Sequence, residues 1–392
     1  MAVVVVTDGE QRSALAAVRS LGRAGHRVHV CAARRSLSGA SRHCAGEHRV
    51  PDALAEPAAF VRAVAEVCAR VGAQVLLPVS EPALLAILPE RERFAGVAIP
   101  FPDAERFARI CDKARVLEAA TAHGIATPRR QHVGTKGDAE RLDGAALRFP
   151  LVVKPSRSVA GDGDGRMKTA VAHAPDAASL RRVLAALPDA AWPVMLQERI
   201  VGPGIGVFVL LRGGRVAAAF AHRRVREKPP SGGVSVLCES APLDGALLER
   251  SVALLGDFGW EGVAMVEYKL DAATGTPYLM EINGRLWGSL QLAVDAGVDF
   301  PRLLVEMALG VPFPPVTTYG VGVRSRWEWG EVDHLVARLR GSGAPLPPDA
   351  PGRGRALADF FRGWGRGTHA QVLRRDDPRP FLRETLDWLR RR

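Results

Sequence analysis

The chain has 392 residues, of which 47% are hydrophobic and 24% are charged, and it carries a formal net charge of +11. This length allows two or three domains with well-filled cores, and the composition is that of a soluble α/β protein. The apolar runs are too short for a signal peptide or a membrane span, and the five cysteines are scattered without a CxxC pair, so we expect a cytoplasmic protein with no membrane partner, no zinc site and no disulfide framework.

The first 110 residues alternate strand and helix, which predicts a doubly wound parallel sheet. The expected strands are 2–6, 27–31 and 75–79, and the expected helices are 13–24, 60–71 and 81–88. Such sheets bind ligands at the carboxyl ends of their strands. Ser80 and Glu81 fall at one such end and are candidate substrate contacts, although a helix N-cap with an acidic first turn would explain them as well. The first loop lacks G-x-G-x-x-G, so we infer no dinucleotide.

The middle of the chain places a lysine before a glycine-rich loop. We expect a helix over residues 103–123, a hinge over 124–128, and a buried strand over 149–153 that ends in Lys154. A lysine in this position can extend over phosphates while the N–H groups of the following loop cradle them. A helix at 177–186 and a strand at 194–198 follow, and the end of that strand can present backbone groups to an adenine edge.

A basic stretch follows the hairpin formed by residues 207–211 and 216–221. Strand alternation would place His222, Arg224 and Arg226 on one face. A solvated basic edge strand is the alternative, but the glycine-rich turn that follows favours an anion-binding face.

Residues 262–288 predict a β-hairpin that carries two carboxylates, an amide and a guanidinium. Alternation turns Glu281 and Asn283 the same way, and Glu267 can join them from the paired strand. Hard oxygen ligands of this kind suit Mg²⁺ that bridges phosphates, and Arg285 could meet a phosphate or a carboxylate. A solvated edge is the alternative reading. The apolar flanks indicate buried strands, however, where unpaired carboxylates are costly, so the pattern implies a cation.

Residues 316–392 form an extension rich in Arg and Trp, which we expect to be a small lid or a packing subdomain. Its tryptophans are expected to lie in a core rather than to bind a ligand; they are Trp327, Trp329, Trp364 and Trp388. The basic charge of the chain suits small anionic ligands or nucleic acid. Because aromatic and basic residues do not interleave as in single-strand binders, we expect no nucleic-acid partner.

Together these elements resemble the ATP-grasp superfamily over about residues 1–310. The resemblance implies nucleotide contacts from two phosphate lysines, a glycine loop and an adenine hinge: Lys113, Lys154, Ser156, Gly161, Gly163, Gln197, Glu198, Arg199 and Ile200. It implies magnesium ligands at Glu267, Glu281 and Asn283, with Arg285, Arg226 and Arg224 beside the transferred phosphate. It also implies an N-terminal domain (1–110), an ATP-grasp domain (111–315, with lobes 127–198 and 199–315) and the extension (316–392).

The activity implied by the resemblance is an ATP-dependent ligation with two Mg²⁺, which Mn²⁺ can replace. A small-molecule carboxylate becomes an acyl phosphate and then an amide with an amine, either an amino acid or a peptide, releasing ADP and phosphate. The N-terminal domain resembles those of biotin carboxylase and carbamoyl-phosphate synthetase, whereas the segments HRRVREKPPSGGVS and EINGRLWGS are more similar to bacterial carboxylate–amine ligases. A bicarbonate-using carboxylase or a carbamoyl-phosphate-type enzyme is therefore the alternative. The further substrate contacts we expect are His222, Trp287 and Gly288, and the resemblance favours a homodimer.

Overall fold

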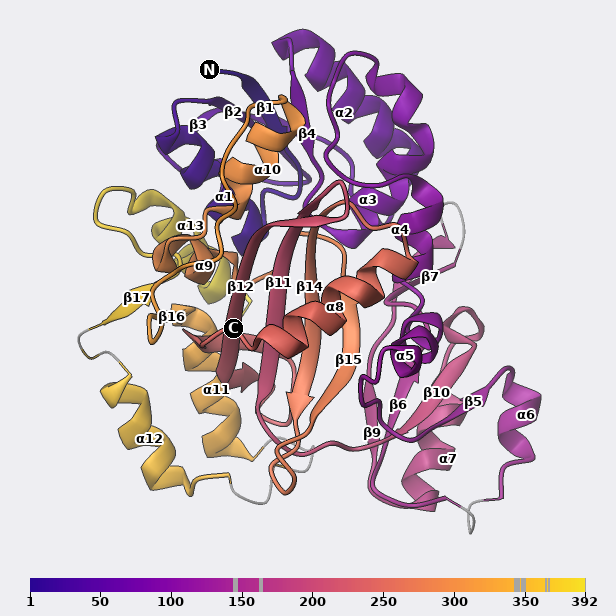
Figure 1. Cartoon of the computed structure of the whole chain (residues 1–392). Helices are drawn as coiled ribbons and strands as arrows, with labels where there is room; N and C mark the ends of the chain where they lie inside the picture. The colour runs from indigo at the N-terminus through magenta and orange to yellow at the C-terminus, as the bar shows by residue number, and fades with distance from the viewer. Residues whose placement is uncertain are drawn as a thin grey trace.

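The computed structural model describes residues 1–143, 147–161, 165–341, 346, 350–363, 365 and 367–391. Within these residues the strands form sheets of four, four, seven and two strands (Figure 1). No described helix is both long and apolar enough to span a bilayer.

The first sheet is parallel, with strand order β3-β2-β1-β4, which confirms the predicted doubly wound parallel sheet. Its strands are β1 (Val3–Val6), β2 (Arg27–Ala32), β3 (Cys44–Arg49) and β4 (Val75–Leu77), and its helices are α1 (Arg12–Arg23), α2 (Pro57–Val71), α3 (Glu81–Ile87) and η1 (Leu88–Phe94). Because β1 and β4 are neighbours, the loops that follow them meet. Asp8 accepts hydrogen bonds there from the Ser80 hydroxyl (2.6 Å) and the Ser80 N–H (3.1 Å).

The single helix expected over residues 103–123 is wrong, because two helices occupy this range: α4 (Ala104–Ile110) and α5 (Lys113–Ala122). The break comes from Asp112, whose extended backbone and side-chain oxygen cap α5 by accepting the N–H groups of Ala114 and Arg115. Lys113 therefore begins a helix, and it is buried.

The second sheet is antiparallel and has its own small core. Its order is β5-β10-β6-β9, formed by β5 (Arg130–Val133), β10 (Val194–Glu198), β6 (Leu151–Pro155) and β9 (Ala172–Ala174), with α6 (Lys136–Glu140), α7 (Ala177–Ala186) and the short η3 (Asp189–Ala191). The described residues of the predicted glycine loop include two paired strands, β7 (Val159–Ala160) and β8 (Met167–Lys168). Gly161 has φ +85°, and a Cβ there would stand 2.4 Å from the Gly165 carbonyl oxygen, so the turn requires glycine. Gly163 lies outside the described residues.

The third sheet has the order β15-β14-β11-β12-β13-β16-β17. Its first five strands are β11 (Gly204–Arg212), β12 (Arg215–Lys228), β13 (Val234–Ser240), β14 (Gly262–Leu270) and β15 (Pro277–Asn283). The predicted β14–β15 hairpin is confirmed. Helix α8 (Gly245–Asp257) crosses one face of this sheet (Figure 1), and α9 (Leu290–Ala296) and α10 (Phe300–Ala308) continue the chain.

The C-terminal extension lengthens the third sheet and packs beside it. It contributes β16 (Arg324–Arg326), β17 (Thr368–Ala370), α11 (Glu328–Arg340), α12 (Arg353–Arg362) and α13 (Arg379–Leu389). Trp329 stacks on Trp388 at 4.1 Å and Trp327 donates its N–H to Glu384, so these tryptophans have the packing role we expected. Trp364 lies outside the described residues.

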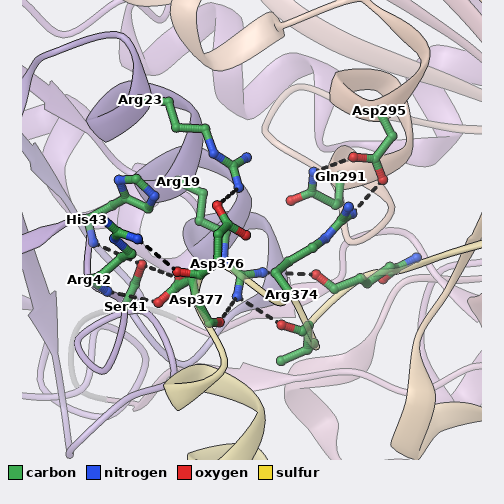
Figure 2. A network of polar contacts seen from close by, with 12 residues as sticks. Arg19, Arg23, Ser41, Arg42, His43, Gln291, Asp295, Arg374, Asp376 and Asp377 are labelled. Atoms are coloured by element: carbon green, nitrogen blue, oxygen red, sulfur yellow. Dashed lines mark hydrogen bonds and ion pairs between the residues drawn. The ribbon is translucent and has the colours of Figure 1, made fainter.

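A polar cluster joins this extension to the first domain (Figure 2). Arg19 of α1 pairs with Asp377 at 2.9 Å, and each side chain is only 1% exposed. Asp377 also accepts the Ser41 hydroxyl and the Arg42 N–H, so loops from distant parts of the sequence share one carboxylate. The two ends of the chain are thereby packed together.

Candidate active site

The carboxylates predicted on the β14–β15 hairpin lie opposite one another. Glu267 and Glu281 are paired positions of the two strands. The Asn283 amide donates to Glu281 at 3.0 Å, and Arg285 donates to the Asn283 oxygen at 2.9 Å. Glu281, Asn283 and Arg285 are therefore linked by hydrogen bonds, and Glu267 lies opposite Glu281 on the paired strand.

Two lysines approach this group from other elements. Lys113, at the start of α5, places its ammonium 3.7 Å from Glu281 and donates to the Ser158 hydroxyl at 2.6 Å. Lys154, at the end of β6, lies 4.0 Å from the sulfur of Met280 and forms no ion pair with a described carboxylate. Three parts of the fold thus bring cations and carboxylates into one site.

The electrostatics of the site keep Glu281 ionised. Burial acts to raise its pKa, but the ammonium groups of Lys113 and Lys154 lower the pKa to about 2. Burial raises the pKa of Glu267, and the Arg224 guanidinium opposes that shift. Burial also lowers the pKa of Lys154 against the attraction of both carboxylates, as expected for a cation that lacks a close partner.

Arg224 of β12 reaches Glu267 of β14 by passing over Gly204 of β11, the strand that lies between β12 and β14. Its guanidinium donates to Glu267 at 2.5 Å and to Glu227 at 2.9 Å. A Cβ at Gly204 would lie 2.9 Å from the Arg224 Cδ, so a larger residue there would obstruct the side chain. Arg224 is therefore positioned beside Glu267 of the carboxylate pair, and its predicted place beside the transferred phosphate stays a prediction.

Arg226 has other partners. Irregularities in strand pairing flank it on both sides, and its guanidinium pairs with Glu331 of α11 and donates to the Asp359 carbonyl. The structure does not bring Arg226 to Glu267 or Glu281, because the bulges interrupt the alternation on which the prediction depended.

The predicted adenine-hinge residues include a buried amide. Gln197 is 1% exposed and its Nε2 has no hydrogen-bond partner among the described residues, and the same holds for the hydroxyl of buried Ser156. Unpaired buried polar atoms are costly, so both fit a polar ligand. Glu198 is engaged with Arg129 at 2.7 Å, Arg199 follows it, and Ile200 is buried.

Three further predicted contacts lie in or against the core. His222 and Trp287 are 1% and 2% exposed and both pack on Phe208, with ring centroids 4.7 and 4.4 Å away. Burial lowers the pKa of His222 to about 3, so this ring is neutral. Gly288 faces Arg12, whose guanidinium would stand 3.2 Å from an added Cβ. None of the three is hydrogen-bonded to the described carboxylates of the hairpin.

The structure shows the helix-cap reading of Ser80 and Glu81, and their role as substrate contacts stays a prediction. The Ser80 hydroxyl accepts the Ala83 N–H and caps α3, which is the helix-cap alternative. Burial raises the pKa of Glu81, opposed by Arg285 and Lys113, so its carboxyl lies in the field of the same cationic cluster. The sequence did not single out Ser158, which holds Lys113; a hydroxyl in a glycine-rich loop gives no distinctive signal.

The part of the chain that contains the carboxylate hairpin matches a family model. Residues 191–328, from β10 to the start of α11, match the model described as ATP-grasp in the biosynthetic pathway with Ter operon. The chain has an ATP-grasp fold. The predicted resemblance and fold class are therefore confirmed.

Solved structures with the ATP-grasp fold resemble most of the chain. The L-amino acid ligase from Bacillus licheniformis is 19% identical, with a TM-score of 0.62 over 80% of this chain and 75% of that one. The biotin carboxylase from Campylobacter jejuni is 14% identical, with a TM-score of 0.62 over 82% and 74%. The N5-carboxyaminoimidazole ribonucleotide synthetase from Thermotoga maritima is 16% identical, with a TM-score of 0.56 over 83% and 79%. No curated protein sequence matches the chain.

Proposed function

We propose that the protein is an ATP- and Mg²⁺-dependent ligase that joins a small-molecule carboxylate to an amine. The observation that carries this proposal is the convergence of Glu267, Glu281 and Asn283 with lysines from two other elements. The ATP-grasp fold and the likeness to an L-amino acid ligase support it.

The donor set fits a nucleotide with a divalent cation. Glu267, Glu281 and Asn283 would hold Mg²⁺, which supplies charge neutralisation at the phosphates when bound. Lys154 and Lys113 would bind phosphate oxygens, and Gln197 would hold the base. Two observations on the described residues support these roles: the desolvated Lys154 ammonium forms no ion pair, and the Nε2 of buried Gln197 has no hydrogen-bond partner.

In the proposed reaction the substrate carboxylate attacks the γ-phosphate of ATP, the bond to ADP breaks, and an acyl phosphate forms. The amine then attacks the acyl carbon, phosphate leaves, and a proton passes from nitrogen to solvent. Arg285 would offset negative charge as it develops on the transferred phosphate. The side chains act by positioning and charge, so no protein nucleophile is required.

The test is ADP release from ATP and Mg²⁺ with amino acids offered singly and in pairs, with bicarbonate in a separate arm. We expect turnover that requires an acid and an amine, and a product mass equal to their sum less one water. Turnover with bicarbonate alone would favour the carboxylase alternative, for which the biotin carboxylase likeness is the supporting observation. The cytoplasmic location, the homodimer and the ability of Mn²⁺ to replace Mg²⁺ stay predictions.

A further inference from the structure

A cavity opens at the carboxyl edge of the first sheet, outside the carboxylate hairpin. Its volume is about 420 Å³, which is in the range of small-molecule sites. Loops after all four parallel strands line it, and Lys168 of β8 lines it as well. The charged lining residues are Asp8, Glu10, Arg34, Asp52 and Lys168, and the uncharged polar ones are Gln11 and Ser80.

The charged side chains around this cavity are not paired with one another. None of the described ion pairs joins two of them, although both signs are present. The Arg34 backbone N–H donates to the Glu10 carboxylate at 3.1 Å, so this carboxylate lies next to Arg34, although it forms no ion pair with the guanidinium of that residue among the described contacts. Burial raises the pKa of Glu10, which is the mark of a carboxylate short of compensating charge.

Some of the remaining lining groups already form hydrogen bonds within the protein, and others do not. Asp8 has φ +57° and accepts bonds from Val79 and Ser80, so it braces the loops after β1 and β4. Arg34 and Lys168 are exposed and form no side-chain bond with described residues. The charged groups available to a ligand are therefore the Glu10 carboxylate and the cations of Arg34 and Lys168.

The mixture of positive and negative groups in the cavity limits the classes of ligand that fit it. A polyanion would meet the carboxylates of Asp8, Glu10 and Asp52. A metal ion is disfavoured because no three described His, Cys, Asp or Glu residues are grouped to hold one. A molecule that carries an ammonium and a carboxylate matches both signs at once.

We propose that this cavity binds an α-amino acid as its zwitterion, with Glu10 holding the ammonium group and Arg34 holding the carboxylate. The inference rests on the proposed ligase function, and it assigns the cavity to one of the two substrates. The neighbouring Glu81 lies between Ser80 and Pro82, which line the cavity, and it is in the field of Arg285. The cavity is thus adjacent to the proposed site of phosphate transfer.

The experiment is calorimetric titration of the full chain, with Mg²⁺ and a non-hydrolysable ATP analogue, using the common L-α-amino acids as probes. For the amino acid that binds, its amide and its N-acetyl derivative are titrated next, because each removes one charge. We expect both derivatives to bind more weakly. Glu10→Gln and Arg34→Ala should each weaken binding by roughly 10-fold or more, the usual cost of a lost charged hydrogen bond.

Glu66→Gln and Arg35→Ala are the matched controls, since both residues are exposed and lie outside the cavity lining. They should leave the amino acid affinity unchanged, and all four variants should bind the nucleotide as the wild type does. Absence of binding by every amino acid, or equal binding by the cavity variants and the controls, would overturn the inference. Loss of ADP formation across all acid and amine pairs, with Glu10-dependent amino acid binding intact, would instead count against the ligase proposal alone.

Discussion

At the scale of single residues, Glu281 is the side chain on which the site depends. It contacts Lys113 and Asn283, and the two lysines lower its pKa to about 2, so it is an anion throughout the neutral range. Glu281→Gln keeps the shape of the side chain and removes the charge. We expect turnover to fall by roughly 100-fold or more, on the scale of a disrupted metal site. Steady-state ADP release checks this, with exposed Glu249→Gln of α8 as the control.

The pH dependence of stability follows from the same group. Because the folded pKa of Glu281 lies below its ordinary value of 4.5, its contribution is present above pH 4.5 and is lost as the pH falls towards about 2. Wild-type stability should therefore decline more steeply than that of Glu281→Gln in this acid window. Acid unfolding of the two proteins can be followed in parallel by circular dichroism. Unfolding curves with the same slope would contradict the depressed pKa of Glu281.

Lys154 is the second residue with a direct consequence. Its ammonium is desolvated and has no carboxylate partner among the described residues, so Lys154→Met should leave the fold intact. We expect nucleotide affinity to fall by roughly 10- to 100-fold, the range for losing a charged hydrogen bond. Fluorescence titration with an ATP analogue measures this, and Lys136→Met on the exposed face of α6 is the control. An unchanged affinity would remove Lys154 from the phosphate site.

Residue-scale prediction from the sequence succeeded where partners are close in the chain. Glu281 and Asn283 were grouped by strand alternation, and Arg285 follows two positions later, so all three fall within five positions. Arg226 shows the limit, because bulges in β12 and an acidic residue more than a hundred positions later decide where its guanidinium goes. Neither feature leaves a local signal.

At the scale of elements, the contact between the extension and the first domain depends on Asp377. This buried carboxylate pairs with Arg19 and accepts bonds from two further residues (Figure 2). Asp377→Asn should lower the free energy of unfolding by about 3 kcal/mol, since it leaves a buried guanidinium without its counter-charge. Urea unfolding measures the change. Asp376→Asn, at a half-exposed neighbour, should change it by less than about 1 kcal/mol.

Glu384 of the extension is expected to make stability depend on pH. Burial raises the pKa of Glu384 to about 7, with Glu328 adding to the shift and the Trp327 N–H and Arg12 opposing it. Between pH 4.5 and about 7 the folded protein therefore holds a proton that the unfolded chain releases, so this group's contribution to stability falls as pH rises. The melting temperature of Glu384→Gln relative to wild type should accordingly increase from about pH 5 to about pH 8. A constant difference would show that Glu384 does not titrate there.

Helices and strands, like single residues, were predicted correctly where their partners are close in the sequence. The β14–β15 and β11–β12 hairpins were predicted because each joins neighbouring strands through a glycine turn. Strands β16 and β17 were missed because their partners are distant in sequence and each has only three residues. The break between α4 and α5 was readable in principle, since Asp112 is a strong N-cap, but the helical pattern on both sides concealed it.

At the scale of the whole molecule, the proposed nucleotide site draws on α5, the second sheet and the third sheet. A ligand that binds there should stabilise all of them together. A non-hydrolysable ATP analogue with Mg²⁺, at about 100 times its Kd, should add about 2.7 kcal/mol to the free energy of unfolding. Thermal scans with and without EDTA test this, and the stabilisation should shrink when the metal is removed. An identical scan with and without the analogue would count against the site.

The order of strands in the third sheet has a consequence for how the protein avoids self-association. Strand β16 pairs along β13 from Leu237 to Glu239, and β17 then covers β16. A chain cut before residue 324 would leave β13 as an open strand edge, with unpaired backbone groups beside the buried side chains of Val236 and Cys238. Open apolar edges are templates for pairing with another molecule. The extension is therefore expected to protect the chain from aggregation, and the truncated chain should form larger assemblies than the full chain in light scattering.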